Sequence, residues 1–487
     1  MMQNNKRPRN NEYRNYKLSR SSKNSIDTIQ LEDPKVTKKW FFEAYIRPRK
    51  PVLIKTSKSK KLRLNIDNFR PGKILETLQS EQHDGDQLKN EFLQVEELNH
   101  GGFGSGQKRL KLKLDEFLNR INKGESLYLT TQYSENNTGP LFEMGSLSFE
   151  GGYEAVGDED DDEEEEEELE GQDVGEAFPE FNGNLSDDDE IENLHDDFDD
   201  VCDEEDHPDD EIDEPVDPIY QPPLSGLLNG NLEKLPPHPF ELTESLVPQQ
   251  INMWFGRTPE DPTLLDITES ENESSVSLIN RGLPTPNSTS TGLHHDHADN
   301  IYVLAQGKKR FTLYSPDYAP DLYTVGDVRC VYDTGVIDYF RNEKAKNWNS
   351  IRADGGCIQS CSTAIESNKI EEKQDPPSFS RIPPALLHLD QVDKKTRKKL
   401  EKYAKDNFPL FYPVMKSSIK VTLEEGDLLY LPAGWFHEVT SFGDEDKNNT
   451  HVAVNYWFVP PDGPTLEQPY SDKVWQENFE MWKEKFL

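Results

Sequence analysis

Six short segments between residues 300 and 459 alternate apolar and polar side chains and lie close together along the chain. They are 300–305, 309–314, 419–423, 427–431, 438–440 and 451–459. Turn sequences such as Ala305-Gln-Gly307 and Glu425-Gly-Asp427 separate them. Because alternation suits strands that bury one face, this pattern predicts a mainly β fold, a barrel or sandwich with flanking helices.

The N-terminal part of the chain predicts a tail followed by folded elements. Residues 1–34 are polar and basic without hydrophobic periodicity, so we expect them to be disordered. Lys6-Arg-Pro-Arg9 is either a nuclear import signal or ordinary solvated charge. Within a folded unit of residues 35–150, the sequence predicts helices that start at Trp40 and span 111–118. It predicts strands at 51–55 and 126–130.

The net charge of −39 comes mostly from one segment. Between Asp158 and Asp217 there are 34 acidic residues and no Lys or Arg; removing these 34 negative charges from −39 leaves −5 for the remainder. Like charges repel and little apolar surface is available, so residues 151–217 are predicted to be a disordered insertion. It is either a solubilising spacer or a binding site for basic partners.

The predicted core, residues 218–465, carries its own insertion at 329–415. Within that insertion the basic segment Lys394–Lys405 is predicted to be a surface helix, set against the acidic insertion. A C-terminal amphipathic helix is expected in 466–487. One of its faces carries aromatic side chains at spacings of four, three and four residues: Trp475, Phe479, Trp482 and Phe486. That face suits core packing or a homodimer contact.

The sequence predicts an intracellular protein, nuclear or cytoplasmic. It has no apolar run long enough to span a membrane and no apolar signal-peptide core. Its four cysteines form no CxxC pair and no Cys/His zinc spacing. We expect neither membrane association nor direct binding to nucleic acid.

Histidines and acidic residues in two distant segments suggest a metal site. His294 and Asp296 are two apart, which places them on one face of a strand and puts His295 and His297 on the other. His297 and Asp299 form a second pair of the same spacing, and spacing alone leaves both open. His437, after the turn–strand–turn sequence 426–436, is the favoured third ligand.

His388 and His451 are the competing candidates for that third position, although neither lies in such a setting. Two imidazoles and one carboxylate form the facial set that holds Fe(II) in non-haem oxygenases and leaves positions open for other ligands.

Three segments together resemble the JmjC (cupin-like) 2-oxoglutarate oxygenase family: 293–300, 306–316 and 426–437. The segment from Phe41 and the segment Gln250–Gly256 resemble its small, JmjC-only branch. The likeness extends over residues 37–130 and 220–465. It implies a double-stranded β-helix that uses Fe(II), 2-oxoglutarate and O₂.

The resemblance also resolves the two His-x-Asp pairs and implies roles for single residues. By position, the metal ligands are His294, Asp296 and His437. Lys309, 15 residues after His294, and Thr291 would hold the distal carboxylate of 2-oxoglutarate, with a hairpin returning Lys309 beside the metal strand. Asn300 and Asn455 would line the co-substrate pocket. Without the resemblance, Lys309 would be read as part of a solvated basic turn.

The implied activity is that of a 2-oxoglutarate-dependent dioxygenase that hydroxylates a protein side chain. A histone lysine demethylase using the same mechanism is the alternative, and the absence of a zinc-binding reader module favours the hydroxylase. The acidic insertion argues the other way, toward the demethylase, because a histone tail is basic. The expected partner is a protein substrate, which a basic histone or ribosomal protein would satisfy. A non-catalytic cupin-fold binding protein and an acidic chaperone remain as readings of a different class.

Overall fold

The computed structural model describes residues 25–56, 61–79, 92–98, 109–130, 219–228, 235–259, 287–340, 350–351, 357–358 and 377–486. The chain divides into two units, Met1–Gly145 with Leu194–Leu487, and Ser146–Asn193, and every described residue belongs to the first. The predicted acidic insertion, the Lys6–Arg9 signal and the side chain of Phe486 lie outside what the structure describes.

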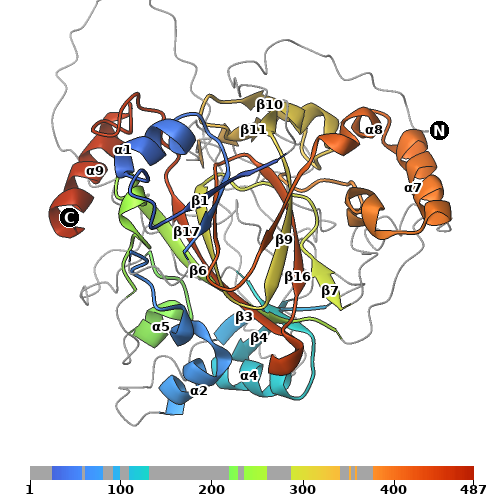
Figure 1. Cartoon of the computed structure of the whole chain (residues 1–487), viewed down its shortest axis with the longest axis horizontal. Coiled ribbons are helices and arrows are strands. Elements are labelled where there is room, and N and C mark those ends of the chain that lie inside the picture. Colours follow the sequence, from blue (N-terminus) through green and yellow to red (C-terminus); the bar gives the residue numbers. More distant parts are fainter. Residues whose placement is uncertain are drawn as a thin grey trace, which may run out of the picture. The chain divides into compact units, whose positions relative to one another are not determined.

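Two β-sheets form the core of the described unit, as the sequence predicts (Figure 1). The larger has the order β1-β2-β15-β8-β17-β6-β5-β3-β4. Its strands are β1 Asp27–Gln30, β2 Val52–Lys55, β3 Phe92–Glu97, β4 Arg109–Lys113, β5 Leu127–Leu129, β6 Pro248–Arg257, β8 Asp299–Gln306, β15 Leu428–Leu431 and β17 Thr450–Phe458. The smaller has the order β14-β9-β16-β7, with β7 Ser288–Ser290, β9 Lys308–Tyr314, β14 Ile419–Leu423 and β16 Phe436–Phe442.

Consecutive strands of the core alternate between the two sheets, which is the jelly-roll arrangement of a double-stranded β-helix. β8 belongs to the larger sheet and β9 to the smaller, and the same exchange recurs through β14, β15, β16 and β17. The side chains between the sheets form one buried cluster that includes Leu53, Tyr302, Phe311, Leu429 and Val439. The predicted hairpin between β8 and β9 is therefore wrong, because the chain crosses from one sheet to the other at Gly307 (φ +83°).

Helices cover the outer faces of the sheets. They are α1 Lys38–Phe41 with the π-helical turn η2 Phe42–Ile46, α2 Pro71–Gln79, α4 Leu114–Asn122, α5 Leu224–Leu228, α7 Lys394–Asn407, α8 Phe411–Val414 and α9 Lys473–Phe486. Single 3₁₀ turns are η3 Ile66–Phe69, η6 Glu241–Thr243, η8 Pro316–Asp321, η9 Pro384–Leu387, η10 Leu389–Gln391, η11 Met415–Ser417 and η12 Glu445–Lys447. None of the described helices has the length and hydrophobicity of a membrane span.

Two predictions for the N-terminal part need correction. The tail was expected to extend to residue 34, but β1 pairs in parallel with β2, with Asp27 opposite Val52. The helix predicted for 111–118 begins as strand β4, in which Leu110 and Leu112 alternate with lysines. It becomes helical only at Leu114. From there α4 buries Leu114, Phe117, Leu118 and Ile121, whose spacing is helical.

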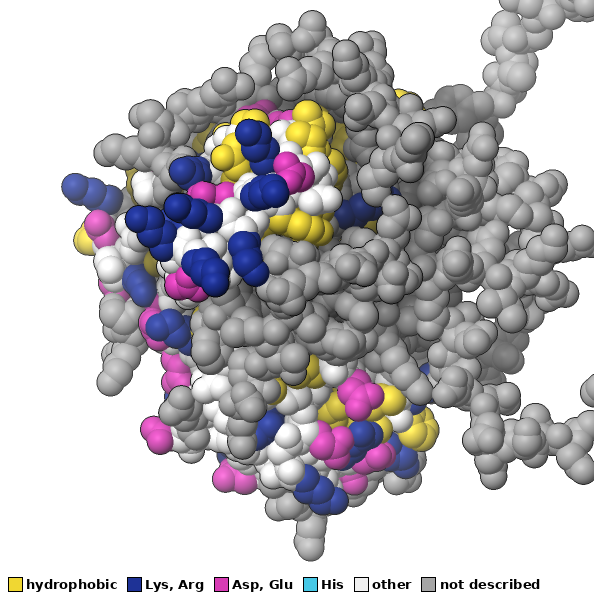
Figure 2. Space-filling model, turned by 90° about the vertical axis from the view of Figure 1, so that its right-hand side faces the viewer, with side chains coloured by type: hydrophobic (Ala, Val, Ile, Leu, Met, Phe, Trp, Pro, Cys, Tyr) yellow, Lys and Arg dark blue, Asp and Glu magenta, His cyan; other side chains and the backbone are white. Residues whose placement is uncertain are grey.

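The segment predicted as an insertion, 329–415, contains ordered elements in its described parts. A hairpin is formed by β10 Val328–Val331 and β11 Ile337–Tyr339, and a two-residue pair by β12 Ser350–Ile351 and β13 Cys357–Ile358. The predicted basic helix is confirmed as α7, which buries Leu400 and Ala404. Figure 2 faces the side that carries α7 in Figure 1 and shows Lys and Arg side chains gathered there. Exposed lysines of α7 include Lys394, Lys395, Lys398, Lys402 and Lys405.

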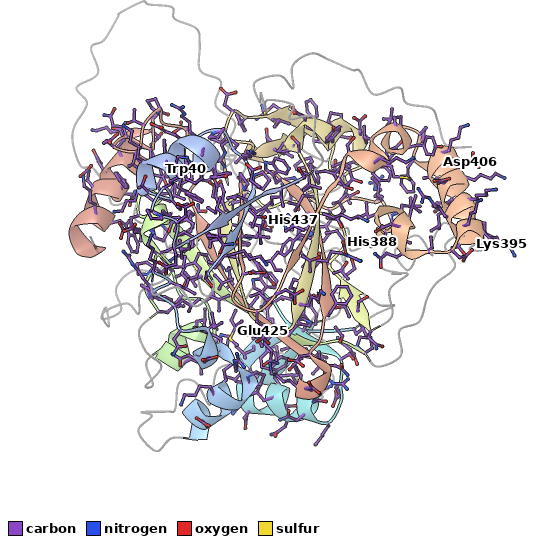
Figure 3. The ribbon with its side chains drawn as sticks, in the orientation of Figure 1. Trp40, His388, Lys395, Asp406, Glu425 and His437 are labelled. Carbon is purple, nitrogen blue, oxygen red and sulfur yellow. The ribbon has the colours of Figure 1, made fainter. Side chains whose placement is uncertain are left out.

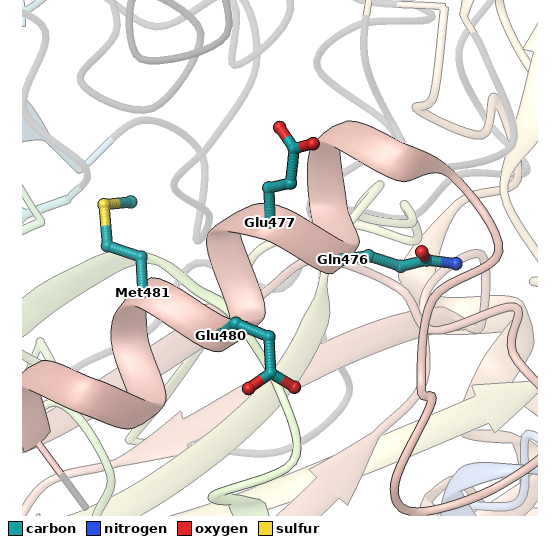
Figure 4. Close-up of a pocket in the computed structure, with 4 residues that line it drawn as sticks. All are labelled: Gln476, Glu477, Glu480 and Met481. Atoms are coloured by element: carbon teal, nitrogen blue, oxygen red, sulfur yellow. The ribbon is translucent and has the colours of Figure 1, made fainter.

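The C-terminal helix packs with its aromatic face inward. Trp475, Phe479 and Trp482 of α9 are buried and belong to the large core cluster on the outer face of the nine-stranded sheet. The opposite side of α9 lines an open hollow formed by Gln476, Glu477, Glu480 and Met481 (Figure 4). Of the two predicted roles for the aromatic face, core packing is the one that this arrangement has.

Candidate metal centre

The two histidines of the predicted metal site come together through their own backbones. His294 N donates to His437 O at 3.0 Å, and His437 N donates to His294 O at 2.7 Å. This is an isolated bridge, because His294–Asp296 precedes β8 and is not part of a strand. The expectation that the His-x-Asp pair sits on a strand is therefore wrong, although the pair still converges with His437 at the start of β16.

The side chains of these segments form a three-ligand cluster. One ligand atom from each of His294, Asp296 and His437 lies within 4.8 Å of the others, and His437 Nε2 is 3.6 Å from Asp296 Oδ2. His437 is buried, while His294 and Asp296 are half-buried. Atoms this close can share one ion, and the set has the donors that Fe(II) takes in facial sites. In Figure 3, His437 lies among the core strands.

Hydrogen bonds fix both imidazoles in the form that a metal requires. His294 Nδ1 lies 3.1 Å from Gly292 O, and His437 Nδ1 lies 2.9 Å from Trp435 O. A carbonyl oxygen only accepts, so each Nδ1 carries the proton and each Nε2 keeps a free lone pair. Burial lowers the pKa of His294 to about 4, and the neighbouring His437 contributes to the shift, so the imidazole is neutral. Phe379 stacks on the His294 ring at 4.8 Å between centroids.

The second His-x-Asp pair does not form a metal site. Asp299 is fully buried and ion-paired with Arg49, and the ring of His297 packs edge-on against Trp457 at 5.9 Å. Within the part of the chain that the structure describes, the only cluster of metal-binding type is His294, Asp296 and His437.

The other histidines near the site do not belong to the ligand cluster. His388 Nε2 pairs with Glu438 Oε2 at 2.9 Å, and Figure 3 places His388 between His437 and α7. His295 was expected to point outward but is buried, with Nε2 2.5 Å from Tyr339 Oη. His451 is fully buried, and its ring lies 5.4 Å from that of Tyr128 between centroids. Neither His388 nor His451 is part of the ligand set.

Lys309 lies inside the fold and not on a solvated turn. Its side chain is 0% exposed, and Nζ donates to Ser441 Oγ at 2.6 Å and to Tyr128 Oη at 3.4 Å. β9 pairs with β16 so that Leu313 lies opposite His437 and Lys309 opposite Ser441. Residues two or four apart on a strand share a face, so Lys309 and His437 face the same interior.

Burial lowers the pKa of Lys309 to about 7. Among the described residues no carboxylate lies within ion-pair distance of Lys309 Nζ, whose partners are two neutral hydroxyls. The nearby His451 ring is also uncharged, since burial and the lysine charge both lower its pKa. A buried ammonium without a counter-ion is costly, and this cost would be relieved by an anionic ligand.

The other predicted co-substrate residues occupy different settings. Thr291 Oγ1 donates to Gly292 O at 3.0 Å and accepts from Val439 N at 3.1 Å, so its hydroxyl already serves the backbone of β16. Asn300 is buried on β8, and its Oδ1 has no hydrogen-bond partner in the described part of the chain. Asn455 is buried on β17 and accepts a bond of 2.8 Å from Trp254 Nε1.

Two residues beside Lys309 were missed by sequence reasoning. Ser441 could have been found, because it lies four residues after His437 on the same strand and therefore on the same face. Tyr128 comes from β5, more than 160 positions before the metal ligands, and no spacing rule connects it to them.

Comparison with known proteins agrees with this geometry. Residues 38–463 match the family of cupin-like domains. JmjC domain-containing protein 4 of Schizosaccharomyces pombe is 24% identical over 527 aligned positions, which cover 91% of this chain and 87% of that protein. JmjC domain-containing protein E of Dictyostelium discoideum is 25% identical over 201 positions, covering 41% of this chain and 47% of that protein.

Lysine-specific demethylase JMJ32 of Arabidopsis thaliana is 26% identical over 184 positions, covering 38% of this chain and 42% of that protein. The family match spans most of the sequence, and the jelly-roll core carries the His-Asp-His cluster on the predicted residues. The chain therefore belongs to the cupin-like JmjC family, which includes Fe(II)- and 2-oxoglutarate-dependent oxygenases and lysine demethylases.

Proposed function

We propose that this protein is an Fe(II)- and 2-oxoglutarate-dependent dioxygenase that hydroxylates a side chain of another protein. The observation that carries the proposal is a pairing within one interior: a three-ligand metal set and a buried lysine that has no counter-ion among the described residues. A 2-oxoglutarate molecule would need both features. It would chelate the metal ion, and the positive charge of the lysine would neutralise its distal carboxylate.

The residues present fit the metal and the co-substrate. Nε2 of His294, Nε2 of His437 and a carboxylate oxygen of Asp296 would hold the ion. Lys309, with the hydroxyls of Ser441 and Tyr128, would hold the distal carboxylate, and the unpartnered Oδ1 of Asn300 leaves an amide available in the same interior. When bound, the iron and 2-oxoglutarate supply an oxidant made from O₂, with succinate and CO₂ as co-products and a hydroxylated C–H bond as the result.

The chain's own residues would orient these groups and exclude water. The backbone bridge between His294 and His437 holds two ligands in a fixed relation before any metal enters. Lys309 is completely buried, so the carboxylate would be held at a site closed to solvent, where a charge-assisted hydrogen bond is strongest. Thr291, which the sequence assigns to this carboxylate, would instead support β16 through Val439 N.

A lysine demethylase is the second candidate, because two Arabidopsis relatives carry that name. The same oxidation at an N-methyl carbon gives a product that releases formaldehyde. We favour hydroxylation because the four cysteines of the chain are too scattered to build a zinc-binding reader module. The acidic segment 158–217 supports a basic substrate such as a histone or ribosomal protein.

The test is turnover of labelled 2-oxoglutarate by the purified full-length chain with Fe(II). We expect succinate from the wild type and none from His294→Ala. Proteins trapped by Asp296→Ala, then treated with wild-type enzyme, should gain the mass of one oxygen atom if the enzyme is a hydroxylase. Loss of a methylene mass with formaldehyde release would identify a demethylase. An inactive wild type that retains no iron would favour a non-catalytic binding protein or an acidic chaperone.

A further inference from the structure

The buried carboxylate of Asp299, close in sequence to the metal cluster, accepts several hydrogen bonds. Asp299 is the first residue of β8, three positions after Asp296, and its side chain is 0% exposed. It accepts hydrogen bonds from both terminal nitrogens of Arg49, with NH1 at 2.8 Å, from Tyr430 Oη at 2.7 Å and from Ala433 N at 3.0 Å. Four donors, two from Arg49 and two from the segment 430–433, therefore converge on one carboxylate.

Arg49 is also fixed by several hydrogen bonds. Its guanidinium Nε donates to Thr334 O at 2.7 Å, and its backbone carbonyl accepts from Trp435 Nε1 at 3.0 Å. Arg49 is 4% exposed and has a φ of 56°, in the left-handed region that non-glycine residues rarely adopt. Such strain persists only where the surroundings determine the conformation.

These contacts join the two arms that carry the metal ligands. Ala433 and Trp435 belong to the turn that precedes His437, whereas Asp299 anchors the arm that contains His294 and Asp296. A third link is direct, since Gly434 N donates to Asp296 O at 2.8 Å. A side chain at Gly434 would collide with Gly335 O, because its Cβ would lie 1.7 Å away. The turn can therefore shift little.

The energetics of a buried ion pair favour a positioning role over simple stabilisation. Apolar residues of similar volume often stabilise a fold as well as a buried ion pair does, because desolvation offsets the Coulomb attraction. What an apolar pair cannot supply is four directional hydrogen bonds that fix the spacing of two loops.

On these grounds we infer that Asp299 and Arg49 are positioning residues of the metal centre: their ion pair sets the distance between the His294–Asp296 arm and the His437 arm. This role rests on the proposed metal-dependent function. Removing the ion pair between Asp299 and Arg49 should weaken metal binding by about 10- to 100-fold, the range known for supporting residues around metal ligands.

The experiment compares Co(II) binding by the full-length wild type, Asp299→Asn and a matched control, Glu244→Gln. Glu244 is also a largely buried carboxylate, paired with Arg63 and Lys38, but it does not belong to the ligand cluster. Affinity is measured by calorimetry, ligand geometry by the visible d–d bands of bound Co(II), and fold by circular dichroism and thermal unfolding.

We expect both variants to lower Tm, and only Asp299→Asn to weaken Co(II) binding and alter the d–d bands. A wild-type affinity and spectrum in Asp299→Asn would overturn the positioning role.

If Asp299→Asn does not fold, the double variant Arg49→Met/Asp299→Leu removes both charges together. A folded double variant with weakened Co(II) binding supports the inference, and one with wild-type binding overturns it. A wild type that binds no Co(II) would overturn the metal centre itself, a result distinct from a change seen only in the variants.

Discussion

Lys309 Nζ and Ser441 Oγ are 2.6 Å apart on neighbouring strands of the smaller sheet, and neither reaches solvent. Ser441 follows His437, a residue of the candidate metal centre, by four residues on β16, so Lys309 and His437 face one interior. This pair identifies where an anion would bind relative to the metal, and it leads to the first prediction.

Lys309→Met should weaken the binding of 2-oxoglutarate while leaving metal binding intact. Loss of a buried charged partner of a carboxylate weakens binding by roughly 2–5 kcal/mol, about 30-fold to several thousand-fold. Calorimetry with Zn(II)-loaded protein measures the affinity without turnover. The control is Lys308→Met, because Lys308 is exposed and pairs with Glu424 at 3.2 Å. Equal affinities in the two variants would refute the assignment of Lys309.

The pKa of Lys309 predicts a pH dependence of 2-oxoglutarate binding. Burial lowers this pKa to about 7 in the free protein, whereas an anion in contact with Nζ favours the charged form. Below pH 7 the lysine is already protonated and the affinity should be constant. Above pH 7 a proton must be taken up on binding, so the affinity should fall by up to about tenfold per pH unit.

Calorimetry in buffers of different ionisation enthalpy would detect this proton uptake directly. Binding of Lys309→Met to the same ligand should show no such uptake. Proton release by the wild type at pH 8, instead of uptake, would contradict the direction of the shift.

His297→Ala should retain metal, although His297 has the same spacing to an acidic residue as His294 has. The His297 ring packs against Trp457, and its would-be partner Asp299 is occupied by Arg49. We expect iron content near that of the wild type in His297→Ala and near zero in His294→Ala, measured by elemental analysis after reconstitution. The reverse order would make the second pair the true ligand set.

Trp475→Ala should lower the free energy of unfolding by about 3–5 kcal/mol, because large core side chains leave cavities when truncated. Trp475 is 3% exposed within the main core cluster, and its neighbour Val474, at 42% exposed, provides the control Val474→Ala. Thermal and chemical denaturation measure the difference. Similar stabilities of the two variants would show that α9 does not contribute to the core, and a Tm that depends on protein concentration would favour the homodimer contact instead.

The strands of the core were accessible from sequence because local patterns encode them, whereas the grouping of His294, Asp296 and His437, which the structure brings together, was chosen through the family resemblance. The alternation in 419–423 corresponds to β14 residue for residue, and the turn before His437 marks the start of β16. The interval between His294 and Lys309 identified the lysine once the family resemblance was recognised.

What sequence could not supply depends on tertiary packing. The His294–Asp296 segment makes only an isolated bridge after Gly292 (φ +76°), so strand alternation misplaced His295. Leu110 and Leu112 satisfy a strand period just before a helical period begins at Leu114, and the boundary cannot be read from either pattern alone. Tyr128 and Arg49 reach the site from distant N-terminal segments, and no local signal connects them with it.

The candidate metal centre lies between the two sheets of the jelly roll, since His294 and Asp296 lead into the larger sheet and His437 lies at the start of a strand of the smaller one. An ion bound by all three residues would connect the two sheets across the interior of the fold. Iron supply would then govern the lifetime of the protein as well as its activity, because a ligand that binds only the native state adds its binding free energy to folding.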